Sequence, residues 1–261
     1  MFLAIDVGNS QTTIGILEDD VVGRRWRLKT DRLDTSDELD AALRSFLALD
    51  GIALAGIEAA AVASVVPVLT DMWCAALRHA LGEEPFIVSA AKVRGIEIAM
   101  PYPTQIGADR IADAVEARAT YGSPAIVVDF GTATNIDVVD GRGRYRGGCI
   151  APGLMLSAAA LFEKAAKLAS IPIEVPPAAI GDTTEHALQA GLVLGVAAQA
   201  EGLVARIKSQ LAAEEGTNEL EHCPVIATGG LSRVIGQATD VFDAIDVDLT
   251  LRGIWRIWQA R

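Results

Sequence analysis

One arrangement occurs twice in this chain: an apolar strand that ends in Asp-x-Gly, followed by small polar residues and a second strand. The copies lie at residues 6–12 and 129–134. Glycine lets the backbone approach a ligand closely, so that N–H groups can face phosphate oxygens, and the aspartate can hold the Mg²⁺ of a nucleotide. A single copy is equally typical of an ordinary surface turn. Two copies in matching contexts predict the paired phosphate-binding hairpins of a duplicated nucleotide-binding fold.

Charge narrows the possible partners. The chain has 261 residues and a net charge of −12. This counts against nonspecific binding to nucleic acid or to an anionic membrane, because such binding depends on phosphate neutralisation. An anionic substrate gains nothing from long-range steering here, so backbone donors, a cation and a few arginines must bind it locally.

The sequence predicts a cytosolic protein. The first strand begins almost at the N-terminus and leaves no room for a signal peptide. Uncharged runs such as residues 147–162 are too short to span a membrane. Cys74, Cys149 and Cys223 are scattered and form no C-x-x-C pair, so neither disulfides nor a zinc site is expected.

Each half of the chain has three strands followed by alternating helices and strands. A capping box at residues 35–38 opens a helix that stops near residue 50. A helical stretch over residues 183–214 is expected to be interrupted by its glycines. The expected strands are 2–5, 13–17, 25–29, 59–66 and 86–88, then 125–128, 135–139, 145–150 and 225–227. Two βββαβα halves, residues 1–118 and 119–261, predict an actin-like ATPase (duplicated ribonuclease H-like) fold with the nucleotide cleft between them.

Two further motifs add to the expected site. Gly229 and Gly230 follow a short strand and open a helix, where close backbone approach suits an adenosine, although a plain turn is also compatible. Asp109 and Arg110 lie in the first turn of another helix, where an aspartate could simply stabilise the helix dipole. In a kinase, Arg110 would bind a substrate carboxylate through two hydrogen bonds. Asp109 would accept the proton of a hydroxyl that attacks the γ-phosphoryl group.

The helix that carries Asp109 and Arg110 has an amphipathic pattern. Its apolar residues Ile111, Ala112 and Val115 are expected to face the core. Asp113 and Glu116 are expected to face solvent. The pattern therefore predicts a surface helix with one polar side.

Together these motifs resemble the type III pantothenate kinase family, and the similarity runs nearly from end to end. The matching segments, specific in their combination and order, are residues 6–9, 64–67, 107–110, 129–133, 147–148, 152–153, 227–231 and 248–253. The resemblance implies an actin-like fold and a homodimer. It also implies ATP-dependent phosphorylation of the primary hydroxyl of pantothenate to 4'-phosphopantothenate, the first step of coenzyme A biosynthesis.

The resemblance further implies roles for individual residues. Asp109 would be the proton acceptor, Asp129 would bind a monovalent cation (potassium or ammonium), and Asp6 would be a ligand of Mg²⁺. The residues implied in ATP binding are Asp6, Val7, Gly8, Asn9, Ser10, Gln11, Thr12, Thr13, Thr132, Gly229 and Gly230. Those implied in substrate binding are Met100, Gly107, Ala108, Asp109, Arg110 and Thr184, the last near the dimer interface.

The departures from the family pattern cluster on the acceptor side. Met100 stands where the family has a substrate-contacting tyrosine, unless Tyr102 fills that place, and Gln105 replaces a glutamate. Asp182 replaces an arginine. Two alternatives therefore stay open: a kinase of the same fold that phosphorylates another small hydroxy acid, and a non-catalytic nucleotide-binding regulator. The paired presence of a positioned carboxylate and two phosphate hairpins favours an enzyme.

Overall fold

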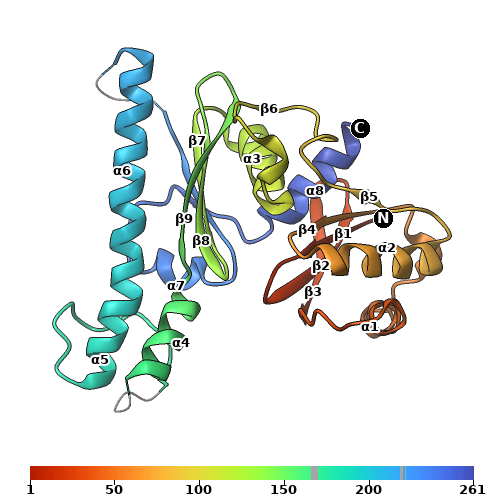
Figure 1. Ribbon diagram of the computed structural model, residues 1–261, viewed down its shortest axis with the longest axis horizontal. Helices are drawn as coiled ribbons and strands as arrows, with labels where there is room; N and C mark the ends of the chain where they lie inside the picture. Colours follow the sequence, from red (N-terminus) through yellow and green to blue (C-terminus); the bar gives the residue numbers. More distant parts are fainter. Residues whose placement is uncertain (166–169, 218–219, 221) are drawn as a thin grey trace. The chain divides into compact units, whose positions relative to one another are not determined.

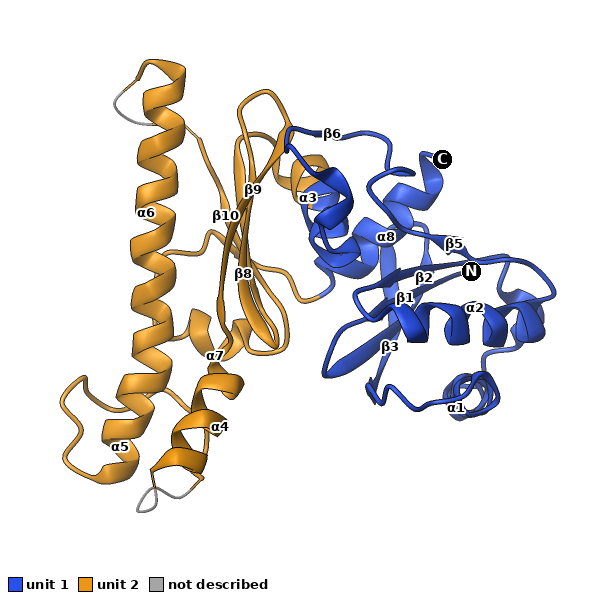
Figure 2. Cartoon of the chain, in the orientation of Figure 1, with its two compact units in different colours: residues 1–116, 248–261 blue, residues 117–247 orange. Residues whose placement is uncertain are grey.

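The computed structural model describes residues 1–165, 170–217, 220 and 222–261 of the chain. It forms two compact units, residues 1–116 with 248–261 (unit 1) and residues 117–247 (unit 2) (Figure 2). The chain therefore passes between the units twice. The sequence prediction assigns the C-terminal helix to the second half, whereas in the structure this helix packs within unit 1, because its apolar face covers the first strand.

Unit 1 is built around a five-stranded sheet of order β3-β2-β1-β4-β5 (Figure 1). The strands β1, β2 and β3 are antiparallel neighbours, and β4 and β5 run parallel to β1. Both faces of β1 are covered, which is why it reads as a continuous apolar run up to Asp6. The bounds are β1 Phe2–Val7, β2 Gln11–Glu18, β3 Val21–Lys29, β4 Ala59–Ser64 and β5 Phe86–Ile87.

Helices cover the two faces of this sheet. One face packs against α1 and α2, and Phe2 on the other face meets Trp258 of α8 with ring centroids 4.6 Å apart. The predicted capping box is confirmed, since Thr35 accepts from the Glu38 N–H and Glu38 accepts from the Thr35 N–H. The bounds are α1 Ser36–Leu49, η1 Leu54–Gly56, α2 Pro67–Leu81, β6 Glu97–Ile98, η2 Pro103–Gln105, α3 Ala108–Tyr121 and α8 Leu249–Gln259.

The polar side of α3 differs from its sequence expectation. Asp113 and Glu116 do not face solvent, because each is only 1% exposed. The Thr250 hydroxyl donates to Asp113 at 2.7 Å, and the guanidinium groups of Arg252 and Arg256 donate to Glu116. Helix α8 supplies all three partners, so this side of α3 is buried against another helix.

Unit 2 repeats the topology of unit 1. Within it the strands β7, β8 and β9 are antiparallel neighbours, β10 runs parallel to β7, and β11 runs parallel to β10. The order β9-β8-β7-β10-β11 thus corresponds to β3-β2-β1-β4-β5 in unit 1. The duplicated arrangement predicted from the two Asp-x-Gly hairpins is therefore confirmed. The bounds are β7 Ala125–Phe130, β8 Ala133–Val139, β9 Arg144–Pro152, β10 Val225–Thr228 and β11 Ala244–Ile245.

A long helical segment packs along the sheet of unit 2 (Figure 1). The expected interruption at its glycines is wrong, because helical turns continue through a π-helical stretch, η3, into α6. By length and composition residues 184–215 could cross a membrane, which is weak evidence, since core helices of soluble proteins pass the same test. The bounds are α4 Leu154–Lys164, α5 Thr184–Gln189, η3 Ala190–Leu194, α6 Gly195–Glu215 and α7 Ser232–Gly236.

Candidate functional site

The first Asp-x-Gly segment joins β1 to β2 in a tight hairpin. The N–H of Gly8 donates to the carbonyl of Gln11 at 3.1 Å. A Cβ on Gly8 would lie 2.9 Å from that oxygen, so the turn favours glycine. Asn9, Ser10 and Gln11 are exposed at the tip of the hairpin, where a phosphate could reach them.

Thr30, directly after β3, fastens this hairpin. Its N–H donates to the Ser10 carbonyl at 3.1 Å, and its hydroxyl donates to the Gly8 carbonyl at 2.8 Å. The hydroxyls of Thr30 and Thr12 are 3.0 Å apart, and Thr12 is 2% exposed, so the Thr12 side chain supports the hairpin from inside. Sequence reasoning misses Thr30, because a lone threonine after a strand has no distinguishing pattern.

The loop between β4 and α2 connects the hairpin to the start of α3. The N–H of Val65 in this loop donates to the Val7 carbonyl at 3.0 Å. A Cβ on Gly107 would lie 3.2 Å from Cγ1 of Val65. Unit 1 therefore brings residues 6–13 and residues 107–110 together on the two sides of Val65.

Asp109 is partly buried in the first turn of α3. Its Oδ1 accepts a hydrogen bond from the Arg110 N–H at 2.8 Å and lies close to Gly107. Burial raises the pKa of the Asp109 carboxyl above its ordinary value, and the N–H and charge of Arg110 offset this only in part. A carboxylate with a raised pKa is a stronger proton acceptor, which suits general base catalysis.

In unit 2, Asp129 of the second hairpin lies between two glycines. A Cβ on Gly131 would lie 3.5 Å from Oδ2 of Asp129, and a Cβ on Gly229 would overlap Oδ1. Gly229 also has a φ of +87°, so both its conformation and the available space require glycine. The second hairpin and the predicted adenosine motif at Gly229 and Gly230 thus meet around one carboxylate.

Thr132 is exposed at the tip of the second hairpin. The N–H of Gly153, which precedes α4, donates to the Thr132 carbonyl at 3.1 Å. A Cβ on Gly153 would overlap that carbonyl oxygen. The glycine before α4 therefore permits the close approach that supports the tip.

Within the part of the chain that the structure describes, no cluster of three or more His, Cys, Asp or Glu side chains could hold a metal ion by itself. Mg²⁺ at nucleotide sites commonly binds one or two carboxylates together with substrate phosphates and waters. A single carboxylate beside the first hairpin, that of Asp6, fits that mode of binding.

The residues predicted to bind the acceptor are divided between the units. Met100 is half-buried in unit 1, whereas Tyr102 is 66% exposed. Thr184 is exposed at the first position of α5 in unit 2. Asp182, two residues before Thr184, has its Oδ1 2.6 Å from Nδ1 of His186, within hydrogen-bond distance. Neither unit alone gathers the full predicted set.

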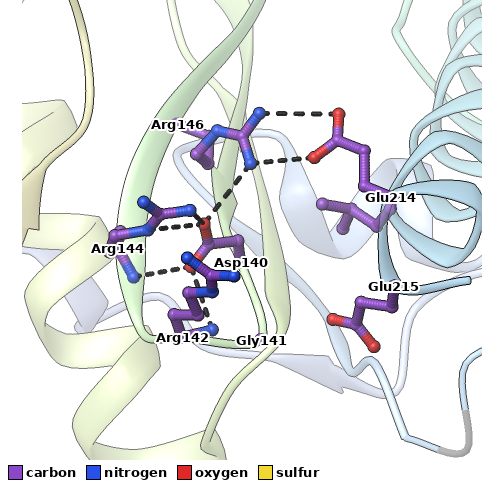
Figure 3. Close-up of a pocket in the computed structure, with 8 residues that line it drawn as sticks. Asp140, Gly141, Arg142, Arg144, Arg146, Glu214 and Glu215 are labelled. Atoms are coloured by element: carbon purple, nitrogen blue, oxygen red, sulfur yellow. Dashed lines mark hydrogen bonds and ion pairs between the residues drawn. The ribbon is translucent and has the colours of Figure 1, made fainter.

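Figure 3 shows a charged pocket of about 360 Å³ in unit 2. Arg144 binds Asp140 through Nε at 2.9 Å and Nη2 at 2.7 Å, and Arg146 binds both Asp140 and Glu214. The pocket lies at the end of β8 opposite to the tip of the second hairpin, and the pair between Arg146 of β9 and Glu214 of α6 ties the sheet to that helix. Its lining residues are Asp140, Gly141, Arg142, Arg144, Arg146, Leu211, Glu214 and Glu215.

Comparison with known proteins adds an independent line of evidence. The family model described as type III pantothenate kinase matches residues 2–206. A protein of this name from Roseiflexus sp. is 40% identical over 259 residues, which are 99% of this chain and 98% of the relative. Another, from Agathobacter rectalis, is 42% identical and covers 97% of this chain and 95% of its own length.

Solved structures bear on the fold. The activator of the 2-hydroxyisocaproyl-CoA dehydratase from Clostridium difficile, with bound ADPNP, has a TM-score of 0.57 at 12% identity and covers 99% of this chain and 93% of its own. A Campylobacter jejuni protein assigned to the Baf family of transcriptional activators has a TM-score of 0.60 at 16% identity. The match covers 98% of this chain and 97% of that protein. These likenesses confirm the predicted fold class and nothing more.

Proposed function

This chain belongs to the type III pantothenate kinase family, and we propose that it transfers the γ-phosphoryl group of ATP to the primary hydroxyl of pantothenate. The product, 4'-phosphopantothenate, begins coenzyme A biosynthesis. One observation carries the proposal: the Val65 N–H bonds to the Val7 carbonyl at the base of the first hairpin, and the Val65 side chain lies beside Gly107, at the turn that holds Asp109. A carboxylate close to a phosphate-binding hairpin is the arrangement that phosphoryl transfer requires.

The proposed chemistry assigns one task to each side chain. The pantothenate hydroxyl oxygen forms a bond to the γ-phosphorus while the bond to the β–γ bridging oxygen breaks and ADP leaves. The hydroxyl proton passes to Asp109, whose pKa is raised by burial. Arg110, the next residue, would bind the pantothenate carboxylate in a bidentate pair and so set the distance between carboxylate and hydroxyl.

Two cations are part of the proposal. Asp6 would hold Mg²⁺ together with phosphate oxygens and waters, and a bound Mg²⁺ neutralises charge on those phosphates. Asp129 would hold a potassium or ammonium ion beside Gly131 and Gly229, where the absence of Cβ atoms keeps the carboxylate accessible. An assay with and without potassium tests this assignment. The response to potassium should disappear in Asp129→Asn, and a retained response would contradict it.

The acceptor is tested by measuring ATP consumption with purified protein, Mg²⁺ and either pantothenate or related hydroxy acids. Pantothenate should give the highest kcat/KM, and Asp109→Asn should remove turnover while the protein stays folded. Full turnover in the folded variant would refute the assigned base. A higher rate with another acid would favour the alternative acceptor suggested by Met100, Gln105 and Asp182, and binding without turnover would favour a regulator.

A cytoplasmic homodimer completes the proposal, and the exposed side of the continuous helical segment formed by η3 and α6 supports it. Gly191, Gly195, Ala198 and Gly202 follow one another at spacings of three or four residues, and all are exposed. A Cβ on any of these glycines would meet nothing within 4 Å, although each glycine costs a helix about 1 kcal/mol relative to alanine. Small residues on an apolar helix suit close packing against the same helix of a second copy.

The dimer is tested by light scattering after size exclusion. Ala198→Glu should shift the protein towards the monomer, because a charge on the packed side of α6 would be buried without a partner. Ala41→Glu, on the exposed side of α1, makes the same chemical change elsewhere and should have no effect. A dimer that survives Ala198→Glu would contradict this interface.

A further inference from the structure

An arginine that the motifs do not include lies at the tip of the first hairpin. Thr30 is bonded to Ser10 and Gly8, as described above. Two residues later, Nη2 of Arg32 donates to Oδ1 of Asn9 at 3.2 Å. A cation is therefore held against the exposed turn in which we place the nucleotide phosphates.

The backbone around Arg32 is fixed on both sides. Before it, Thr30 is fastened to the hairpin. After it, the Leu33 N–H donates to Oδ1 of Asp31 at 3.0 Å, the Asp34 N–H donates to the Asp31 carbonyl at 3.2 Å, and Thr35 caps α1. The main chain of this segment therefore has a defined path while the Arg32 side chain stays exposed.

Because the whole protein is negatively charged, a cation at this position would favour the binding of an anionic nucleotide. With a net charge of −12, the long-range field opposes the approach of a triphosphate. A guanidinium offers five N–H donors in a rigid plane that matches phosphate oxygens, and the contact to Asn9 uses one of them. A local arginine can thus offset the field at the place where the phosphates bind.

We propose that Arg32 binds the terminal phosphates of the nucleotide and is a catalytic residue of this kinase. The inference rests on the proposed function, in which the first hairpin holds the phosphates nearest to Asp109. Both belong to unit 1, whereas the adenosine motif at Gly229 belongs to unit 2. Arg32 should therefore recognise the β- and γ-phosphates and leave the adenosine end unaffected.

The experiment compares the affinities of ATP, ADP and AMP, measured by titration calorimetry in Mg²⁺ buffer. Arg32→Gln should weaken ATP about tenfold or more, the effect of losing a charge-assisted hydrogen bond, and should change AMP less than twofold (about the error of a Kd). Arg32→Lys keeps the charge without the planar guanidinium, so its affinity for ATP should lie between those of the unaltered protein and Arg32→Gln. The control is Arg78→Gln, which removes the same charge from the last turn of α2, where Arg78 pairs with Glu84.

The outcomes separate this inference from the function on which it rests. If the unaltered protein binds no ATP, the proposed kinase function fails first. If it binds ATP but Arg32→Gln leaves all three affinities unchanged, or lowers all three equally, Arg32 does not bind the terminal phosphates. A selective loss for ATP, with kcat/KM reduced and the melting temperature equal to that of Arg78→Gln, supports the assignment.

Discussion

Replacing Glu116 with glutamine should lower the free energy of unfolding of the protein by about 3 kcal/mol. The Glu116 carboxylate accepts hydrogen bonds from Arg252 Nε at 3.1 Å, from Arg256 Nε at 2.6 Å and from Arg256 Nη2 at 3.2 Å. Glutamine keeps the shape of the side chain but carries no charge. Its NH₂ group would also face guanidinium groups, which can only donate.

The magnitude follows from the burial of the partners. Removing one member of a buried ion pair costs about 3–5 kcal/mol, because the remaining charge is left without compensation. Glu116 is 1% exposed, whereas Arg252 and Arg256 are 23% and 31% exposed, so solvent stabilises the arginines in part. The lower end of the range is therefore expected, and for a chain of this size it corresponds to a melting temperature lower by about 6–12 °C.

Thermal unfolding at neutral pH, followed by circular dichroism, measures this effect. The matched control is Glu214→Gln, because Glu214 is 40% exposed where it pairs with Arg146. Exposed pairs contribute about 0.2–1 kcal/mol, so the control should shift the midpoint by at most about 4 °C. If the two variants melt within about 2 °C of each other, the reasoning from burial is refuted.

Four further predictions concern the site and the residues that support it. Asp109→Asn should have a higher melting temperature than the unaltered protein at neutral pH, because burial raises the pKa of the Asp109 carboxyl and its ionised form therefore opposes folding. This difference in melting temperature should shrink as the pH falls through the raised pKa. Melting curves at several pH values test both statements. For the same reason the acidic limb of the kcat/KM profile should lie above the ordinary range of an aspartate. Gly253→Ala should lower the melting temperature, because its Cβ would overlap the carbonyl of Ala112, whereas Gly23→Ala, with 3.8 Å to the nearest atom, should be tolerated. Gly229→Ala should weaken ATP binding in calorimetry, since a side chain is strained at its φ of +87°; unchanged affinity would count against a role for this turn.

The duplicated architecture was accessible from the sequence because its signals are local. Asp-x-Gly turns, apolar strands and the capping box at residues 35–38 each depend on neighbouring residues. Asp109 could be singled out in the same way, from its place in a helix first turn. What local patterns could not supply was which of these segments meet.

The failures all involve partners that are distant in the sequence. Helical periodicity predicts that Asp113 and Glu116 face solvent. This prediction fails because the groups that bury them come from residues 250–256, which periodicity within α3 does not include. Thr30 and Arg32 carry no pattern of their own, and only the pairing of β2 with β3 brings their segment to the hairpin. Glycine propensity predicts breaks in the helical stretch, but the packing of α6 on the sheet overrides it.

The double passage of the chain between the units has a consequence for biosynthesis. Residues 248–261 leave the ribosome after the whole of unit 2, yet they supply Trp258 to Phe2 and two arginines to Glu116. The face of β1 that α8 covers therefore stays exposed on the nascent chain until unit 2 has been translated, at about 5–20 residues per second. During that interval the exposed β1 face is a natural target for chaperones, and ribosome-bound chains that stop before residue 248 should remain sensitive to protease in residues 1–116.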